Sequence, residues 1–125
     1  MNKNTSLTPL EQDVMTVIWN NPNCDVRCVQ TKLLHKRNLA YTTTMTIMNR
    51  LVEKGVLKRE KSANKFLYLA ITSRRQAAQG FLENFFTTMF GQYGQDGISA
   101  FAEEVERLPK EKREQLKEML ENETK

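Results

Sequence analysis

A short run of hydroxyl, amide and guanidinium side chains could contact a nucleic acid. On a helical wheel, the polar residues between positions 42 and 53 fall on one face. The candidates for contacts with base edges and phosphates are Thr42, Thr43, Thr46, Asn49 and Arg50. Threonine and asparagine are short enough to let a helix lie close in a major groove, and a guanidinium can bind a phosphate or a guanine. The alternative is an ordinary solvated face, although threonine is a poor helix former.

A basic hairpin is expected directly after this segment. Residues 56–61 and 66–71 are typical of two strands, and residues 62–65 of a polar turn between them. The hairpin carries four cations, which are Lys58, Arg59, Lys61 and Lys65. A two-stranded wing beside a recognition helix can hold the flanking phosphates. Lysine and arginine also protect exposed sheet edges, which is the alternative explanation.

Two cysteines and the single histidine form a second candidate site. Cys24 and Cys28 are four residues apart, and His35 follows seven residues later. Two thiolates and an imidazole could hold a soft metal if one helix face carried all three. A structural zinc normally takes four ligands, however, and cysteine is also a common buried apolar residue. We therefore expect no metal and no other cofactor, and keep a metal- or redox-responsive role as an alternative.

No residue set in the sequence indicates an enzyme. There is no glycine-rich phosphate loop and no Ser-His-Asp or His-Glu set of known spacing. Two cysteines are too few for a disulfide scaffold. No apolar run is long enough to span a bilayer, and the first six residues lack an apolar signal core, so we expect no membrane insertion and a cytoplasmic location.

The elements that position the polar face are expected to be capped helices. Thr8 to Glu11 form a capping box with a proline at the first helical position, and Asp25 can cap a second helix. A third helix is expected from about Thr42 to Lys54, with Gly55 as its stop. Its second face is apolar and is expected in the core, with Thr44, Ile47, Met48, Leu51 and Val52. Three helices followed by a hairpin are the order of a winged helix-turn-helix.

The rest of the chain is expected to form helices that pair two copies of the protein. Ser73 can cap a fourth helix, residues 91–97 are expected to be a flexible break, and Pro109 opens a sixth helix after a fifth. The apolar residues of these helices form a stripe that is too wide for a small winged helix to bury, which favours a homodimer. The alternative is that this C-terminal region folds back on its own winged-helix domain. The expected contact residues are Phe81, Leu82, Phe85, Phe86, Met89, Phe90, Phe101, Val105, Leu116 and Leu120.

The net charge also differs between the N-terminal and C-terminal parts of the chain. The chain has 125 residues and a net charge of +4, of which residues 1–72 carry +6 and residues 73–125 carry −2. A basic segment suits a polyanion. We therefore expect a mainly α fold with a small β-hairpin, in which residues 1–72 are a winged-helix DNA-binding domain and residues 73–125 a helical dimerisation region.

Several motifs carry a family resemblance. They are Leu7-Thr8-Pro9-Leu10-Glu11 with Ile18-Trp19, then Ala40-Tyr41-Thr42-Thr43, and Asn49-Arg50-Leu51-Val52-Glu53-Lys54-Gly55. In these the sequence resembles the penicillinase-repressor (BlaI/MecI/CopY) family, closely over residues 6–72 and loosely beyond. The resemblance implies a dimeric repressor that binds a palindromic operator and controls antibiotic-resistance or stress and homeostasis genes. It also implies that Thr42, Thr43, Thr46 and Arg50 face the DNA.

The sequence departs from the family's two known release mechanisms. In the β-lactam-responsive members, a membrane sensor-protease pathway leads to cleavage of an Asn-Phe bond, and the comparable place here is Ala100-Phe101. The copper-responsive members carry C-terminal Cys-x-Cys motifs, and this chain has no cysteine after Cys28. The inducing signal and operator stay open, and an alternative function is a winged-helix protein-interaction module that does not bind DNA.

Overall fold

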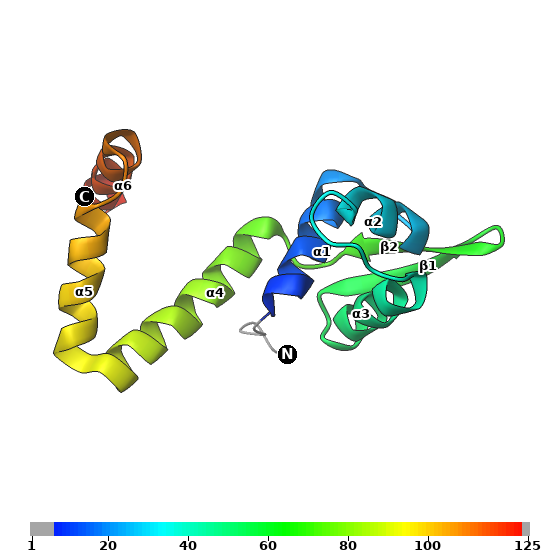
Figure 1. Ribbon diagram of the computed structural model, residues 1–125, viewed down its shortest axis with the longest axis horizontal. Helices are drawn as coiled ribbons and strands as arrows, with labels where there is room; N and C mark the ends of the chain where they lie inside the picture. Colours follow the sequence, from blue (N-terminus) through cyan, green and yellow to red (C-terminus); the bar gives the residue numbers. More distant parts are fainter. Residues whose placement is uncertain (1–6, 124–125) are drawn as a thin grey trace. The chain divides into compact units, whose positions relative to one another are not determined.

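The fold is mainly helical with one small sheet, as expected. The computed structural model describes residues 7–123. Its first part contains three helices followed by an antiparallel hairpin (Figure 1), namely α1 (Pro9–Asn20), α2 (Val26–Leu33), α3 (Tyr41–Glu53), β1 (Leu57–Ser62) and β2 (Lys65–Ala70). None of the described helices is long and apolar enough to cross a membrane.

Local capping explains where these helices begin. At α1 the Thr8 side chain accepts a hydrogen bond from the Glu11 backbone, and the Glu11 carboxylate accepts one from the Thr8 backbone. This confirms the expected capping box, which satisfies backbone donors that a helix start leaves open. Asp25 caps α2 through the Cys28 backbone N–H at 2.8 Å. The caps set the starting points of the helices that support α3.

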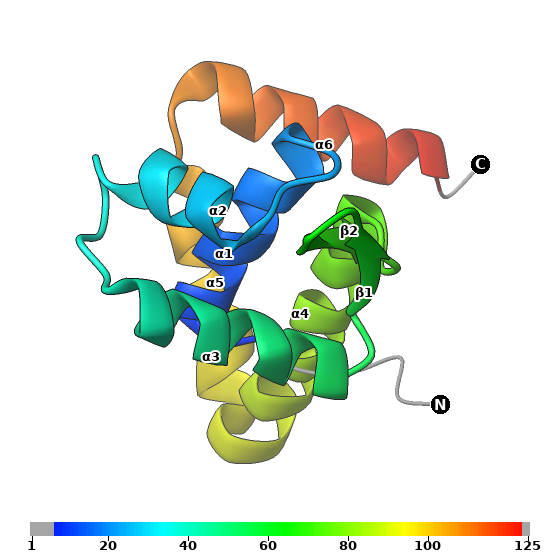
Figure 2. The ribbon, with the colours of Figure 1, turned by 90° about the vertical axis from the view of Figure 1, so that its right-hand side faces the viewer.

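The end of α3 depends on a glycine. Gly55 has a φ of 82°, a left-handed conformation that favours glycine. The Gly55 N–H donates to the Val52 carbonyl, and the Val56 N–H donates to the Leu51 carbonyl. These two bonds form a Schellman motif, which closes the helix and directs the chain into β1. The hairpin therefore begins at the C-terminal end of α3, as Figure 2 shows.

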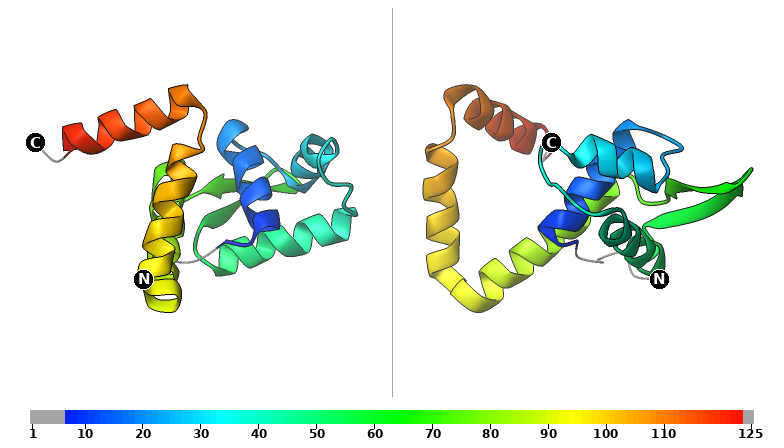
Figure 3. Two further views of the ribbon diagram at one scale, coloured as in Figure 1. Left: turned by 60° about the vertical axis from the view of Figure 1, so that its left-hand side comes forward. Right: turned by 45° about the vertical axis from the view of Figure 1, so that its right-hand side comes forward.

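The chain divides into two compact units, residues 1–84 and residues 85–125. In the first unit one apolar core joins α1, α2, α3 and the base of the hairpin. The core side chains are Val14, Met15, Ile18, Cys24, Val26, Val29, Leu33, Ile47, Met48, Leu51, Val56, Leu57 and Tyr68. Beyond this core the hairpin turn projects past the helices (Figures 1 and 3). In this unit α3 and the wing lie on the outside of the core.

A fourth helix, α4 (Arg74–Thr88), follows the hairpin. Ser73 and Gln76 cap its start reciprocally, because the Gln76 N–H donates to the Ser73 hydroxyl and the Ser73 N–H to the Gln76 side chain. The expected cap at Ser73 is therefore confirmed. The division between the two compact units falls inside this helix, after Asn84.

The expected flexible break at residues 91–97 is wrong. Residues Met89–Tyr93 form a turn of π-helix, η1, which leads directly into α5 (Gly94–Glu106). A Cβ on Gly97 would lie 2.8 Å from the Met89 carbonyl oxygen, so only glycine fits there. The glycines permit a close return of the chain rather than disorder. The last helix is α6 (Lys110–Glu123), which begins after Pro109 as expected.

Phenylalanines form the centre of the second unit. The rings of Phe85 and Phe86 each lie 6.2 Å from the ring of Phe101, and Phe86 stacks on Phe90. All four side chains nevertheless remain exposed, Phe90 by 55%. Met89 is the one apolar side chain of the described part of this unit that is buried.

Candidate nucleic-acid interface

The two faces of α3 are arranged as the helical wheel predicts. Thr44, Ile47, Met48 and Leu51 are buried. On the other face the exposed residues are Thr42, Thr43, Thr46 and Arg50, and Asn49 is half-buried. The hydroxyl of Thr46 donates to the Thr42 carbonyl at 2.9 Å. Because this bond uses its proton, Thr46 offers the outside only acceptor lone pairs and a methyl group.

The strand register divides the four wing cations between two faces. Opposite residues of an antiparallel pair lie on the same face, and the register pairs Arg59 with Tyr68 and Lys61 with Phe66. Lys58 and Lys65 alternate with them and belong to the other face. This division was not visible in the sequence, because it depends on the register.

Asn49 joins α3 to the wing. Its side-chain oxygen accepts a hydrogen bond from the Tyr68 hydroxyl at 2.9 Å and one from the Arg59 guanidinium at 3.3 Å. Tyr68 is buried, and Arg59 also lies over the Phe66 ring at 4.6 Å from its centroid. The exposed face of α3 and one face of the wing thus form a continuous surface. Asn49 and Arg59 were expected at this surface, whereas the part played by Tyr68 was missed.

Two of the wing lysines pair with acidic residues. Lys58 lies 3.2 Å from Glu60, and Lys65 lies 3.3 Å from Asp25, the residue that caps α2. The Cys28 backbone hydrogen bond, followed by the contact with Lys65, lowers the pKa of Asp25. Asp25 is therefore ionised near neutral pH and ties the hairpin turn to the start of α2.

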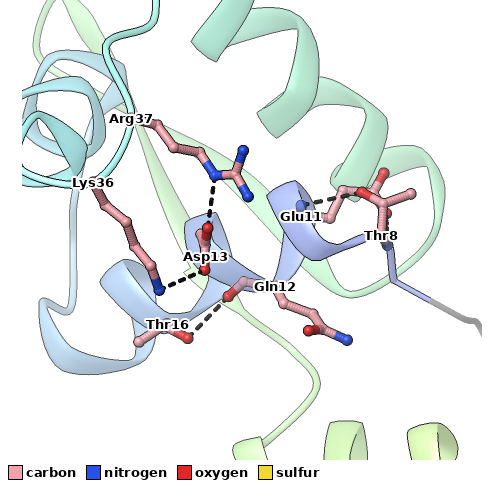
Figure 4. Close-up of polar contacts among 7 residues, drawn as sticks. All are labelled: Thr8, Glu11, Gln12, Asp13, Thr16, Lys36 and Arg37. Carbon is pink, nitrogen blue, oxygen red and sulfur yellow. Dashed lines mark hydrogen bonds and ion pairs between the residues drawn. The ribbon is translucent and has the colours of Figure 1, made fainter.

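A buried carboxylate holds the far end of α3. Glu11 is 1% exposed, and its Oε1 lies 2.6 Å from the Lys54 Nζ at the C-terminal cap of α3. Burial raises the pKa of Glu11, but the hydrogen bonds from Lys54 and from the Thr8 backbone outweigh it and leave the pKa below its ordinary value. Figure 4 shows Glu11 turned toward Thr8 at the start of α1. The ion pair thus fixes α3 on α1.

A second carboxylate holds the segment that precedes α3. Arg37 and Lys36 converge on Asp13 of α1, at 2.7 Å and 3.1 Å (Figure 4). The hydrogen bond from Arg37, and then that from Lys36, lowers the pKa of Asp13. These two cations contribute to the basic charge of this unit, but they serve the fold by anchoring the connection between α2 and α3.

The cysteines do not form the metal site that was considered as an alternative. Cys24 and Cys28 are joined by a disulfide, with their Cα atoms 5.5 Å apart. Sulfurs in a disulfide cannot act as thiolate ligands. His35 is exposed, and no cluster of three metal-binding side chains occurs among residues 7–123. The hypothesis of a metal site built from these three residues is therefore wrong for the disulfide form of the protein. The disulfide leaves a redox role of the two cysteines as the remaining alternative.

Comparisons with known proteins point to one family. The family described as penicillinase repressor matches residues 7–122. The chain is 24% identical to the penicillinase repressor of Staphylococcus aureus over 95% of this chain and 94% of that protein. It is 32% identical to the transcriptional regulator BlaI of Mycobacterium tuberculosis over 66% of this chain and 60% of that protein.

Solved structures agree with the fold. The monomeric form of Bacillus licheniformis BlaI, in complex with the blaP half-operator, is 25% identical with a TM-score of 0.51, over 58% of this chain and 88% of that one. A MarR family protein from Bacillus stearothermophilus matches 99% of this chain and 80% of that one, at 14% identity and a TM-score of 0.52, which supports the winged-helix fold alone. The chain therefore belongs to the penicillinase repressor family, a family of DNA-binding transcriptional regulators rather than enzymes.

Proposed function

We propose that the chain is a dimeric repressor that binds a palindromic operator through α3 and the wing. The observation that carries this proposal is the link between Asn49, Tyr68 and Arg59, which makes the exposed face of α3 and one wing face a single polar surface. In a winged helix such a surface suits a major groove and the adjoining backbone. The B. licheniformis relative was solved in complex with a half-operator, which supports operator binding by this chain.

Each part of this surface would have its own role. Thr42, Thr43, Thr46 and Arg50 would meet base edges or phosphates in the groove. Asn49 would contact a base only through its amide nitrogen, because its oxygen is occupied by Tyr68 and Arg59. The four wing cations would supply attraction for phosphates, with Arg59 and Lys61 nearest to α3 and Lys58 and Lys65 on the opposite face.

The C-terminal part of α4 and the second unit would provide the contact with a partner copy. A palindrome is matched by a two-fold protein, and exposed apolar patches of this size mark contacts with a partner. The proposed contact is the apolar stripe from Phe81 to Leu120, which contains Leu82, Phe85, Phe86, Met89, Phe90, Phe101, Val105 and Leu116. We place residues 1–72 as the DNA-binding domain and residues 73–125 as the dimerisation region.

The regulated genes would be those for antibiotic resistance or for stress and homeostasis. The protein would act in the cytoplasm, where the chromosome lies. An upstream sensor protease, if it acts on this chain, would not meet an Asn-Phe bond in α5, where Ala100 and Phe101 stand. Asn84-Phe85 is inside α4.

The test is a titration of the full chain with two labelled duplexes, followed by fluorescence anisotropy over a salt series. One duplex carries the promoter of the gene that encodes the chain, and the other has a random sequence. Arg50→Ala is expected to weaken binding to the promoter about tenfold or more, and more than binding to random DNA, as loss of a base contact does. Arg75→Ala, an equal charge change at an exposed position of α4, is the matched control and should change little.

The wing is tested in the same assay. Lys61→Ala should weaken both duplexes about equally and lower the slope of affinity against salt by about one. If the wild-type chain shows no salt-dependent binding to either duplex, the proposal is wrong and the protein-interaction module is the better hypothesis.

A further inference from the structure

The Cys24–Cys28 disulfide lies where α2, the wing and α3 meet. Cys24 belongs to the buried core, and its carbonyl accepts the Tyr68 N–H at 3.0 Å in an isolated bridge to β2. The hydroxyl of the same Tyr68 donates to Asn49 on α3. Two steps of direct contact therefore connect the disulfide with the surface proposed to bind DNA.

A second connection to the wing starts from Asp25, at the beginning of α2. Asp25, between the two cysteines, accepts from the Cys28 N–H and pairs with Lys65 in the wing. The disulfide thus encloses the residue that caps α2 and anchors the hairpin. Breaking the bond returns conformational freedom to Cys24 and Asp25, which contact the wing at Tyr68 and Lys65.

We propose that Cys24 and Cys28 are a reversible redox modification site that sets the affinity of the repressor for DNA. The inference rests on the proposed function and supplies its regulation. In the disulfide form the wing is held on α3 before DNA arrives. In the dithiol form DNA binding must also order Cys24 and Asp25, which lowers the affinity. In a reducing cytosol, where the chain is proposed to act, a disulfide is more often transient and redox-sensing than structural.

The chemistry is an exchange with a small thiol such as glutathione. Cys28 is half-buried whereas Cys24 is buried, so the glutathione thiolate attacks the Cys28 sulfur and Cys24 leaves as a thiolate that takes up a proton. A second glutathione thiolate then attacks the glutathione sulfur of the mixed disulfide and releases Cys28. The products are the protein dithiol and one oxidised glutathione, and the reverse exchange with oxidised glutathione reforms the protein disulfide.

The experiment compares the full chain after incubation with oxidised glutathione and after reduction with dithiothreitol, with the small molecules removed. Thiol titration and intact mass establish the state of the cysteines. Binding to the promoter duplex and to the random duplex is then measured by anisotropy. We expect the disulfide form to bind about five- to tenfold more tightly, within the usual range of coupling between two sites. By the same linkage, saturating DNA should make the disulfide harder to reduce in glutathione buffers by the same factor.

Two variants separate this coupling from general damage. Cys28→Ser should bind like the reduced wild type whether or not the chain is exposed to oxidised glutathione, and its helical circular dichroism should match the wild type. Tyr68→Phe removes the hydroxyl that reaches Asn49 and should reduce the ratio between the two redox forms toward one.

The outcomes are distinct. Equal affinities of the two forms, or two free thiols after incubation with oxidised glutathione, would overturn the redox inference and leave the proposed function standing. Absence of DNA binding in both forms would overturn both proposals.

Discussion

The two units of the chain differ in how far their apolar side chains are buried. In the first unit side chains from three helices and the hairpin share one buried core. In the second unit the large apolar side chains stay exposed, and Met89 alone is buried among those described. The first unit therefore has a core of its own, whereas the second has apolar surface suited to another copy. Stability and assembly should respond to different residues.

The largest effect is expected in the core of the first unit. Leu51→Ala should lower the free energy of unfolding by about 2–5 kcal/mol, because it removes buried methyl groups and leaves a cavity. Trp19 is the single tryptophan and belongs to this unit, so its fluorescence during urea unfolding measures the change. The loss should be the same at low and high protein concentration. Gln79→Ala, at an exposed position of α4, should stay within about 0.5 kcal/mol of wild type.

The second unit should show the opposite behaviour. Phe90→Glu should weaken the dimer about 100-fold, since it places a charge in an apolar contact. Sedimentation velocity over a range of concentrations measures this shift, and Trp19 fluorescence should show little change in the first unit. A chain that is monomeric before the substitution would contradict the assignment of this unit to dimerisation.

The buried ion pair gives a further contrast within the first unit. Lys54→Met keeps the side-chain stem but leaves the Glu11 carboxylate buried without its cation, and should cost about 2–4 kcal/mol. Lys36→Met removes the more exposed of the two cations at Asp13, where Arg37 remains, and should cost less than about 1 kcal/mol. Urea unfolding of both variants makes the comparison. Equal costs would mean that burial of Glu11 is not what makes its ion pair important.

Low pH should destabilise the first unit by protonating carboxylates that form ion pairs. The pKa of Asp13 is lowered in the folded state by Arg37 and Lys36, so its stabilisation is fully present above the ordinary aspartate pKa and is lost as the pH falls through the folded value. Asp13→Asn should lower the free energy of unfolding by about 1 kcal/mol at pH 7. Below about pH 4 the free energy of unfolding of this variant should fall less steeply with pH than that of the wild type. Glu106→Gln removes an exposed carboxylate that pairs with Lys117 in the second unit, and it is the control because it should leave the pH profile of the first unit unchanged. The measurement is urea unfolding from pH 7 to pH 3, and identical pH profiles for Asp13→Asn and wild type would contradict this role.

Features set by neighbouring residues were predictable from the sequence. The capping box at Thr8, the caps at Asp25 and Ser73, and the two faces of α3 each depend on spacings of three or four residues, which helical geometry fixes. The same holds for the position of the hairpin. Sequence periodicity therefore predicted the outline of the winged helix and the exposed face of α3.

Features set by the register and by tertiary contacts were not predictable. Asn49 meets Tyr68 across 19 residues, and Asp13 meets Arg37 across 24. Nothing in the local pattern specifies either pair. The π-helical turn after α4 was mistaken for a flexible break, because glycine is also the usual residue of loops and the close approach of Gly97 to Met89 appears only in three dimensions. The disulfide was missed for the same reason, since a spacing of four residues allows a bond without requiring it.

A hydroxyl-radical footprint of the full chain on the promoter of its own gene tests the central claim most directly. If α3 enters the groove and the second unit pairs two copies, the footprint should show two protected patches related by two-fold symmetry. Their centres should be separated by about one helical turn of DNA or a multiple of it. Both patches should fade together with rising salt and with Arg50→Ala. A single patch, or no salt-dependent protection at any concentration, would contradict the account.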